Sequence, residues 1–318
     1  MSSSATSDDI LHDFTPLLRH YKDGRIERLM GGAAVPPSLD PTTGVQSKDV
    51  QISPDLPISA RLYLPKTAAA QATKVPLLFY FHGGGFLIES AFSSVYQKHL
   101  NLLTSAANVV AVSVEYRLAP ENPLPAAFDD AWTAVNWAAS DAADDWIKRH
   151  GDFGRVYLGG DSAGGNIAHN IALRFGRGNP AGMNLVGMFL NCPFFSGKDP
   201  IGDERSDTGV LGKIFTDKMW FYACPGLTGL DEAWVNPSAD LKVLSGLKCG
   251  RVLVYTAGKD YLKDRGRQYT AAVAESGWGG EIEAVEVEEE GHVFSVLDPD
   301  GENSQKMFAR VASFINRP

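Results

Sequence analysis

One short stretch, Gly160-Asp161-Ser162-Ala163-Gly164, restricts the possible folds of this chain more than any other. The apolar run 155–159 before it predicts a strand, and residues 166–173 after it predict a helix. The two glycines let the chain turn sharply without a Cβ clash. The turn lifts the Ser162 hydroxyl above the sheet and leaves the next backbone N–H at the start of the helix. This strand, sharp turn and helix together form the pattern of a nucleophile elbow.

Apolar runs alternate with helical stretches along most of the chain. Continuous apolar strands separated by helices predict a parallel sheet covered on both faces, which is an α/β fold. We therefore expect an α/β-hydrolase fold with a mostly parallel central sheet flanked by helices. The expected strands of this sheet are 76–81, 109–114, 155–158, 185–190, 251–255 and 282–287, the last two followed by helices 261–275 and 302–315, with an antiparallel pair 48–52 and 58–64 before them.

Two segments do not fit the alternating pattern, and we expect them to form a helical cap on a single domain, 1–318. The segment 193–237 is rich in Gly, Pro, charge and aromatic residues, and irregular stretches of this length are usually lids or binding elements. The N-terminal 1–45 is too short to fold alone; it predicts a helix over 9–21 followed by a Pro/Gly-rich stretch.

Composition excludes several classes of function. The formal net charge is −9, and the 29 Lys and Arg residues are scattered, so nucleic acid is not expected as a partner. The start of the chain has no basic and apolar leader and no run approaches 18 apolar residues, so we expect a cytoplasmic protein without a membrane partner. The three cysteines, at wide spacings, predict free thiols rather than a disulfide framework or a metal cluster.

A second motif supports a catalytic interpretation of Ser162. The sequence His82-Gly83-Gly84-Gly85-Phe86 comes directly after an expected strand. Consecutive glycines allow backbone N–H groups to point into a site, and acyl transfer needs such donors about 3 Å from the developing oxyanion. We expect Gly84, Gly85 and Ala163 to supply these donors, with His82 and Gly83 supporting the loop.

A serine nucleophile needs a base and an acid that orients the base, in the chain order Ser, Asp or Glu, His. His292 is the one histidine that fits this order, since five precede Ser162 and His169 lies on the helix that follows it. Asp260 follows the strand before and is the expected orienting acid. Asp264, one helical turn later, remains an alternative.

These motifs, with Tyr116-Arg117-Leu118-Ala119-Pro120-Glu121 and Gly291-His292-Val293-Phe294, strongly resemble the plant carboxylesterase family, in the hormone-sensitive-lipase-like branch of the α/β-hydrolases. The resemblance covers nearly the whole chain. It implies Ser162 as nucleophile, His292 as general base and then acid, Asp260 as orienter, an oxyanion hole of Gly84, Gly85 and Ala163, and no cofactor or metal. It also implies hydrolysis of small-molecule carboxylic esters. We expect a monomer or homodimer.

The same family contains members that are not hydrolases, so two alternatives stay open. Gibberellin receptors of this fold look like esterases that have lost the catalytic histidine, whereas His292 is present here. Isoflavanone dehydratases resemble this chain closely but commonly carry threonine at the position of Ser162, and a lyase or cyclase activity remains the main alternative. Eight apolar residues could line a substrate pocket, although packing is expected for most: Phe14, Leu17, Leu18, Leu87, Phe194, Phe195, Phe215 and Trp220.

Overall fold

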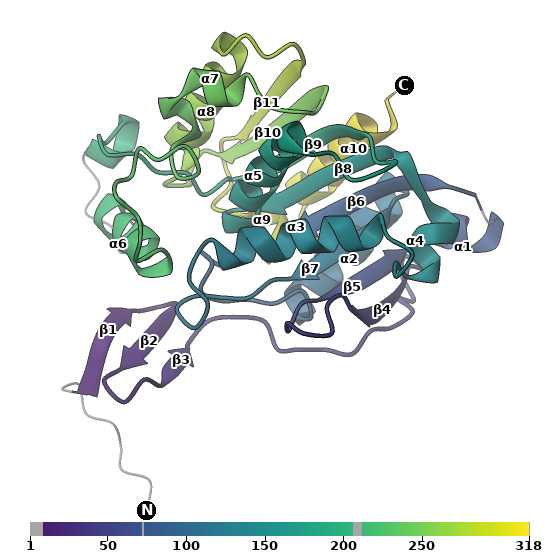
Figure 1. The fold of residues 1–318 in the computed structure, drawn as a ribbon, viewed down its shortest axis with the longest axis horizontal. Coiled ribbons are helices and arrows are strands. Elements are labelled where there is room, and N and C mark those ends of the chain that lie inside the picture. Colours follow the sequence, from purple (N-terminus) through teal and green to yellow (C-terminus); the bar gives the residue numbers. More distant parts are fainter. Residues whose placement is uncertain (1–8, 72, 206–211, 318) are drawn as a thin grey trace, which may run out of the picture.

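The computed structural model describes residues 9–71, 73–205 and 212–317 and is built around a central β-sheet (Figure 1). Within these ranges the sheet has eight strands in the order β11-β10-β9-β8-β6-β7-β5-β4. The strands from β11 to β7 are parallel, and β5 and β4 run antiparallel at one edge. Their bounds are β4 Gln46–Gln51, β5 Ser59–Leu64, β6 Val75–Phe81, β7 Val110–Glu115, β8 Gly151–Asp161, β9 Leu185–Asn191, β10 Arg251–Ala257 and β11 Glu281–Val287.

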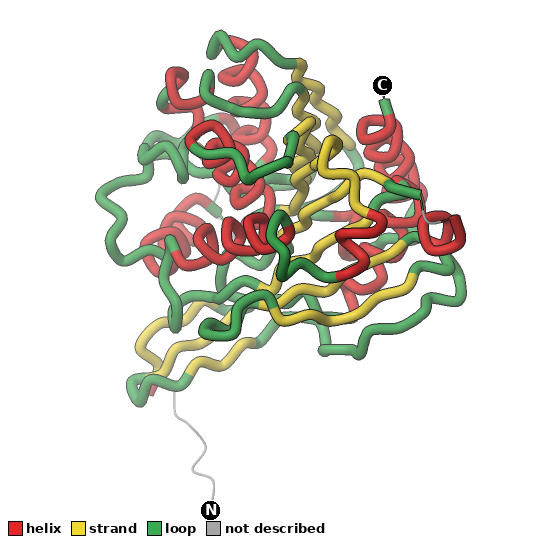
Figure 2. The backbone as a smooth tube through the Cα atoms, turned by 45° about the vertical axis from the view of Figure 1, so that its right-hand side comes forward, coloured by secondary structure: helices red, strands yellow, loops and turns green. Residues whose placement is uncertain are grey.

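Helices cover both faces of this sheet, as Figure 2 shows. Side chains alternate along each strand, so Leu77 and Phe79 of β6 enter one apolar cluster while Leu78 and Tyr80 enter the other. The first cluster is closed by α3 Ala126–Ala138, α5 Ala163–Arg177 and α8 Lys263–Glu275, and the second by α2 Ser94–Ala107, α9 Phe294–Leu297 and α10 Glu302–Asn316. Three shorter helices are α1 Lys66–Gln71, α4 Asp145–His150 and α7 Leu241–Leu244.

The expected strands are confirmed, with one notable difference in length. β8 covers Gly151–Asp161 rather than 155–158, because its first residues pair with Val75 and Pro76 before an irregularity in the ladder. The local sequence Gly151-Asp152-Phe153-Gly154 hides this extension, since Gly and Asp are poor strand formers. Pairing with β6 thus determines where β8 begins. The order of the strands agrees with the predicted α/β fold.

The helix expected over 9–21 is wrong. This segment forms β1 Ile10–Phe14 and β2 Leu18–Tyr21, which pair antiparallel and continue into β3 Ile26–Arg28 as a small separate sheet. The apolar spacing of the segment fits a helix, but Pro16 would lie in the helix interior, where it lacks an N–H and clashes with a carbonyl one turn earlier. Pro16 lies instead in the turn between the two strands.

The second irregular segment contains η2 Gly202–Arg205 and α6 Lys213–Ala223, with η3 Pro237–Ala239 at its end. α6 contacts the N-terminal sheet: the Phe14 ring lies 4.6 Å from that of Tyr222, and the Tyr222 hydroxyl is 2.9 Å from His20 Nδ1. The two segments that sequence analysis assigned to a cap thus lie against each other, apart from their residues 1–8 and 206–211, which lie outside the described residues.

Most of the eight apolar residues considered for a substrate pocket pack into the core. Phe14, Leu18, Leu87, Phe194, Phe195 and Trp220 are buried, while Leu17 and Phe215 are partly buried against the same cluster. The three cysteines are free, as expected, and all three are buried. In the part of the chain that the structure describes, no helix combines the length and apolar character needed to cross a bilayer.

Candidate active site

Ser162 lies at the turn between β8 and α5, and its backbone is held in an unusual conformation. Its φ of 51° and ψ of −117° are costly for a residue with a side chain. The turn is fixed by backbone bonds on both sides: the Ser162 N–H donates to the Asn191 carbonyl at 2.9 Å, and its carbonyl accepts from Phe194 N–H at 2.9 Å. The surrounding fold therefore imposes the position of the hydroxyl at this turn.

The glycines of the elbow are required by close approach of the backbone. A Cβ on Gly164 would overlap the Phe81 carbonyl oxygen at the end of β6, and a Cβ on Gly160 would overlap the backbone of Gly164. Glycine thus allows α5 to begin directly against the ends of β6 and β8. The structural requirement agrees with the sequence interpretation of this motif.

The structure brings the side chains of Ser162, His292 and Asp260 into one chain of hydrogen bonds. His292 Nε2 lies 3.0 Å from Ser162 Oγ, and His292 Nδ1 lies 2.8 Å from Asp260 Oδ2. The second oxygen of Asp260 accepts the Leu262 N–H at 3.0 Å. Asp260 follows β10 and His292 follows β11, so the carboxyl ends of neighbouring parallel strands supply both groups.

Electrostatics favour an ionised Asp260 beside a basic imidazole. Burial acts to raise the pKa of the Asp260 carboxyl, but the charge and hydrogen bond of His292 outweigh burial and lower it. Burial likewise acts to lower the pKa of the His292 imidazole, and the charges of Asp260 and Asp161 outweigh this effect and raise it. The pair can therefore accept a proton from Ser162 and stabilise the imidazolium that results.

Asp264, the alternative orienting acid, points to other partners. Its Oδ1 accepts from Arg267 Nη1 at 2.8 Å, and its Oδ2 accepts the Asp203 N–H at 2.9 Å. Asp264 lies in the first turn of α8, whereas Asp260 precedes this helix. Of the two carboxylates, that of Asp260 contacts His292.

The glycine loop after β6 presents free backbone donors near the elbow. Gly84 and Gly85 have φ values of 103° and 63°, a region that suits glycine. Within the described residues, the N–H groups of Gly84, Gly85 and Ala163 donate no hydrogen bond to the protein. Ala163 is the first residue of α5, where the orientation of the peptide dipoles favours a negative charge. These donors have the character that an oxyanion requires.

His82 braces this loop. Its Nδ1–H donates to the Gly83 carbonyl at 2.8 Å, its ring stacks on Tyr116 at 4.2 Å, and its own carbonyl accepts the Tyr116 hydroxyl at 2.7 Å. Complete burial lowers the pKa of the imidazole to about 4, so the ring is neutral at physiological pH. A neutral ring with its Nδ1 occupied fits a supporting role.

Sequence reasoning missed a buried network centred on Asp161. The carboxylate accepts the hydroxyls of Tyr80 and Tyr96, each at 2.8 Å, and the Tyr96 oxygen accepts the Gly83 N–H at 2.7 Å. Burial raises the pKa of Asp161 to about 6, although both hydroxyls act to lower it. Asp161 stands at a variable position of the elbow motif, and Tyr96 lies on α2, so only an acidic residue ending a buried strand hinted at such partners.

α6 lies over the glycine loop. A Cβ on Gly85 would overlap the terminal methyl of Met219, and the Trp220 ring stacks on Phe194 at 4.9 Å and approaches Phe86 at 5.3 Å. Aromatic packing thus fixes this helix directly above the proposed oxyanion donors.

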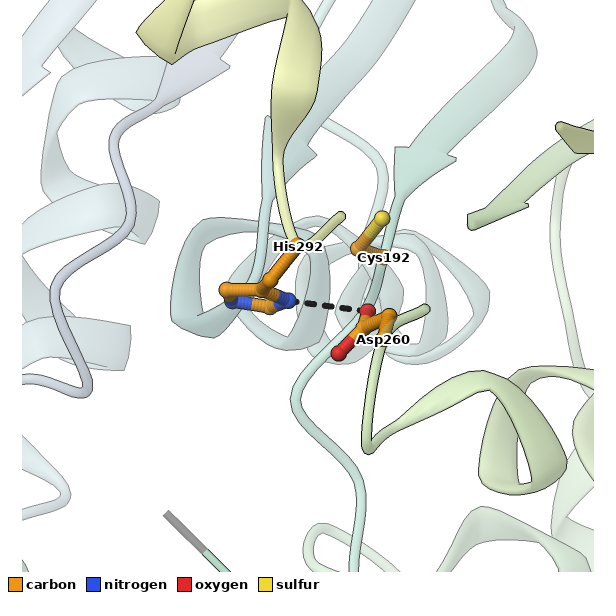
Figure 3. A group of neighbouring side chains, drawn as sticks. All are labelled: Cys192, Asp260 and His292. Carbon is orange, nitrogen blue, oxygen red and sulfur yellow. Dashed lines mark hydrogen bonds and ion pairs between the residues drawn. The ribbon is translucent and has the colours of Figure 1, made fainter. Parts of the chain in front are cut away.

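One group of side chains offers mixed metal-ligand atoms in the described part of the chain. Cys192, Asp260 and His292 present sulfur, oxygen and nitrogen atoms within 4.8 Å of one another (Figure 3). Burial raises the pKa of the Cys192 thiol well above its ordinary value, so the sulfur is protonated at neutral pH. Asp260 and His292 bind each other, as Figure 3 shows, and the geometry suits proton transfer better than metal binding.

Comparison with known proteins gives matches over most of the chain. A family model described as the alpha/beta hydrolase fold matches residues 78–296. The chain is 45% identical to 2-hydroxyisoflavanone dehydratase of Glycyrrhiza echinata, over 99% of this chain and 98% of that protein. It is 43% identical to probable carboxylesterase 13 of Arabidopsis thaliana, over 96% and 98%. It is also 43% identical to the chloroplastic tuliposide A-converting enzyme 2 of Tulipa gesneriana, over 98% and 80%.

Solved structures share the architecture. A thermostable esterase from Pseudomonas putida superimposes with a TM-score of 0.73 at 22% identity, over 88% of this chain and 84% of that one. An esterase from Pyrobaculum calidifontis gives a TM-score of 0.69 at 28% identity, over 85% and 84%. The arrangement of sheet and helices is therefore common to proteins of distant sequence.

Proposed function

Because the chain belongs to the α/β-hydrolase family, in the group of plant carboxylesterases and 2-hydroxyisoflavanone dehydratases, we propose that it hydrolyses carboxylic esters of small molecules. The single observation that carries this proposal is the continuous chain of hydrogen bonds from Ser162 Oγ through His292 to Asp260. Similar relatives named as carboxylesterases support the same reaction class.

The proposed reaction has two stages. His292 Nε2 takes the proton of the Ser162 hydroxyl as the oxygen attacks the ester carbonyl, and returns it to the leaving alcohol. Water then attacks the acyl-enzyme, with His292 acting as base again. Asp260 holds the Nδ1–H tautomer, which leaves Nε2 free to accept the serine proton.

We assign the oxyanion hole to the backbone N–H groups of Gly84, Gly85 and Ala163. They come from two sides of Ser162, the loop after β6 and the start of α5. Removal of one such donor costs about 3 to 4 kcal/mol of transition-state stabilisation in a comparable site.

We propose that the segments of about 1–45 and about 193–237 together form a cap on a single domain, 1–318. The contacts of α6 with Gly85 on one side and with the N-terminal sheet on the other support this assignment. Arg28 of β3 also donates to the Leu87 carbonyl at 2.7 Å, which joins the N-terminal segment to the glycine loop. Apolar groups from α6 next to the proposed oxyanion donors favour esters with apolar acyl or alcohol parts.

The free, buried cysteines are compatible with a reducing compartment, and we propose the cytoplasm. Since one relative is named as chloroplastic, a tagged full-length protein in plant cells is the test. Signal confined to plastids would contradict the cytoplasmic assignment.

Hydrolysis of short-chain p-nitrophenyl esters tests the function. We expect wild-type turnover that a serine-directed phosphonate blocks, and a loss of more than about 10⁴-fold in Ser162→Ala. Asp260→Asn should lose activity severely, whereas Asp264→Asn, whose carboxylate binds Arg267, should stay close to wild type. Near-normal turnover by Ser162→Ala would contradict the mechanism.

One observation favours a second candidate. The relative at 45% identity is named as a dehydratase, and the same oxyanion donors and His292 could serve proton transfer in an elimination. Incubation with a 2-hydroxyisoflavanone in ¹⁸O-labelled water separates the two reactions. Loss of water without hydrolysis of any ester would replace the esterase proposal with a lyase.

A further inference from the structure

Behind the glycine loop lies a cluster of titratable side chains that the proposed reaction does not use. It consists of His82, Glu89 and Glu115. His82 is completely buried, and its Nε2 has no hydrogen-bond partner among the described residues. The Oε2 atom of Glu89 is also buried and has no hydrogen-bond partner among these residues. Glu115, the last residue of β7, has a side chain that is 25% exposed. Such groups are expensive to bury and call for a role.

Glu115 binds the end of the glycine loop and lies near its beginning. Its Oε2 accepts the Ala91 N–H at 2.6 Å and the Ser90 hydroxyl at 2.9 Å, both at the end of the loop. The same oxygen lies 4.0 Å from Nε2 of His82, where the loop begins. One carboxylate thus anchors Ser90 and Ala91 close to His82, which lies eight or nine positions earlier in the chain.

The loop needs such support because its own backbone is strained. Between His82 and Ala91, four residues have positive φ values: Gly84 at 103°, Gly85 at 63°, Phe86 at 65° and Glu89 at 73°. Phe86 and Glu89 carry side chains, and this conformation costs them on the order of 1 kcal/mol or more each. A strained loop keeps its shape only when surrounding contacts hold it.

We propose that Glu115 is a positioning residue for the oxyanion hole: its carboxylate holds the loop from His82 to Ala91 in the conformation that directs the Gly84 and Gly85 N–H groups toward the Ser162 acyl carbonyl. This inference rests on the proposed ester hydrolysis for its catalytic consequence, whereas the support of the loop can be measured without turnover.

Titratable and charged groups from three parts of the fold surround Glu115. Glu115 faces His82 from the residue after β6, Glu89 from the loop and Arg61 from β5. Burial raises its pKa to about 7, helped by the charge of Glu89 and opposed by Ala91, Ser90 and Arg61. Since the His82 Nδ1–H is bound to Gly83, Nε2 is left as an acceptor facing Glu115. The ionised carboxylate accepts from Ser90 and Ala91, and its Oε2 lies 4.0 Å from the Nε2 of His82.

Two substitutions at this position separate positioning from general stability. Glu115→Ala removes the acceptor, and we expect kcat to fall at least about 10-fold while KM changes less than about threefold, with an equal loss of affinity for a trifluoromethyl ketone analogue of the transition state. Glu115→Gln keeps an acceptor oxygen and should restore kcat to within about threefold of wild type. Ser90→Ala, which removes one donor to the same oxygen, should lower kcat by about two- to fivefold.

The matched control is Glu283→Gln on the edge strand β11. Glu283 also accepts from other side chains, Arg310 and Arg317, but lies far from the loop in sequence and at the edge of the sheet. The kcat of the Glu283→Gln variant should stay within twofold of the wild-type value. An unchanged kcat in Glu115→Ala, or equal losses in Glu115→Ala and Glu115→Gln, would overturn the positioning role, and active-site titration with a phosphonate corrects for unfolded protein.

Hydrogen–deuterium exchange tests the loop without turnover. Exchange is measured for the amides of residues 83–88, which excludes Ala91, whose amide Glu115 binds directly. We expect Glu115→Ala to raise exchange there at least about fivefold and Glu115→Gln to leave it near wild type. Unchanged exchange in Glu115→Ala would overturn the proposal. If exchange rises in Glu115→Ala but the wild-type protein hydrolyses no ester, Glu115 still supports the loop and the proposed function is refuted.

Discussion

The hydroxyl of Tyr96 joins the elbow to the glycine loop, and its removal is the sharpest perturbation that the structure offers. Tyr96→Phe keeps the ring, which lies on α2 and is 2% exposed. It removes the oxygen that donates to Asp161 at 2.8 Å and accepts the Gly83 N–H at 2.7 Å. No other atom is lost, so the effect reports on these two hydrogen bonds.

The expected cost follows from what remains buried. The Gly83 N–H loses its partner, and an unsatisfied buried donor costs about 1 to 3 kcal/mol. The Asp161 carboxylate loses one of two tyrosine donors, and a hydrogen bond to a charged group contributes about 1.5 to 3 kcal/mol. We therefore expect the free energy of unfolding to fall by about 2.5 to 6 kcal/mol. Because Gly83 precedes the proposed oxyanion donors, we also expect kcat to fall about 10-fold.

Urea denaturation followed by fluorescence measures the first quantity, and p-nitrophenyl ester hydrolysis the second. The matched control is Tyr157→Phe, whose equally buried hydroxyl makes one bond, to the Ile315 carbonyl at 2.9 Å, away from the site. The control should lose about 1 kcal/mol and no activity. If Tyr96→Phe loses no more stability than Tyr157→Phe, the Asp161 network does not support the elbow.

Because the pKa of His292 is raised above its ordinary 6.5, the acid limb of kcat/KM should have its midpoint above pH 6.5, and Asp260→Asn should move it to lower pH; an unmoved limb would contradict the pairing. Gly164→Ala should destabilise the protein by at least about 3 kcal/mol in thermal unfolding, because its Cβ would overlap a backbone carbonyl, whereas Gly178→Ala, with open space around it, should cost far less. The pKa of Glu115 is raised from 4.5 to about 7, so its contribution to stability is complete below about pH 4.5 and is lost as pH rises through 7. Glu115→Gln should therefore gain about 2 to 3 kcal/mol relative to wild type between pH 5 and pH 8, and a constant difference across this range would refute the assignment.

Local sequence was sufficient wherever the chain itself fixed the geometry. Ser162 between Gly160 and Gly164 predicted a sharp strand-to-helix turn because only glycine permits the approach of α5 to β6. The continuous apolar runs predicted a buried parallel sheet, because strands covered on both faces need apolar side chains in both directions. His292 followed from chain order, since no other histidine stands after the expected acid.

Tertiary structure decided what depends on partners distant in the chain. Spacing left Asp260 and Asp264 as alternatives, and the placement of β10 beside β11 brought Asp260 to His292 while Asp264 bound Arg267. The apolar spacing over 9–21 predicted a helix. The segment instead forms the strands β1 and β2, and Phe14 of β1 packs against Tyr222 of α6. For the buried acceptor Asp161, the local sequence offers only an acidic residue at the end of a buried strand and does not identify its partners. Its donors come from β6 and α2, and a hydrogen bond across 65 or more residues exists only once the chain has folded.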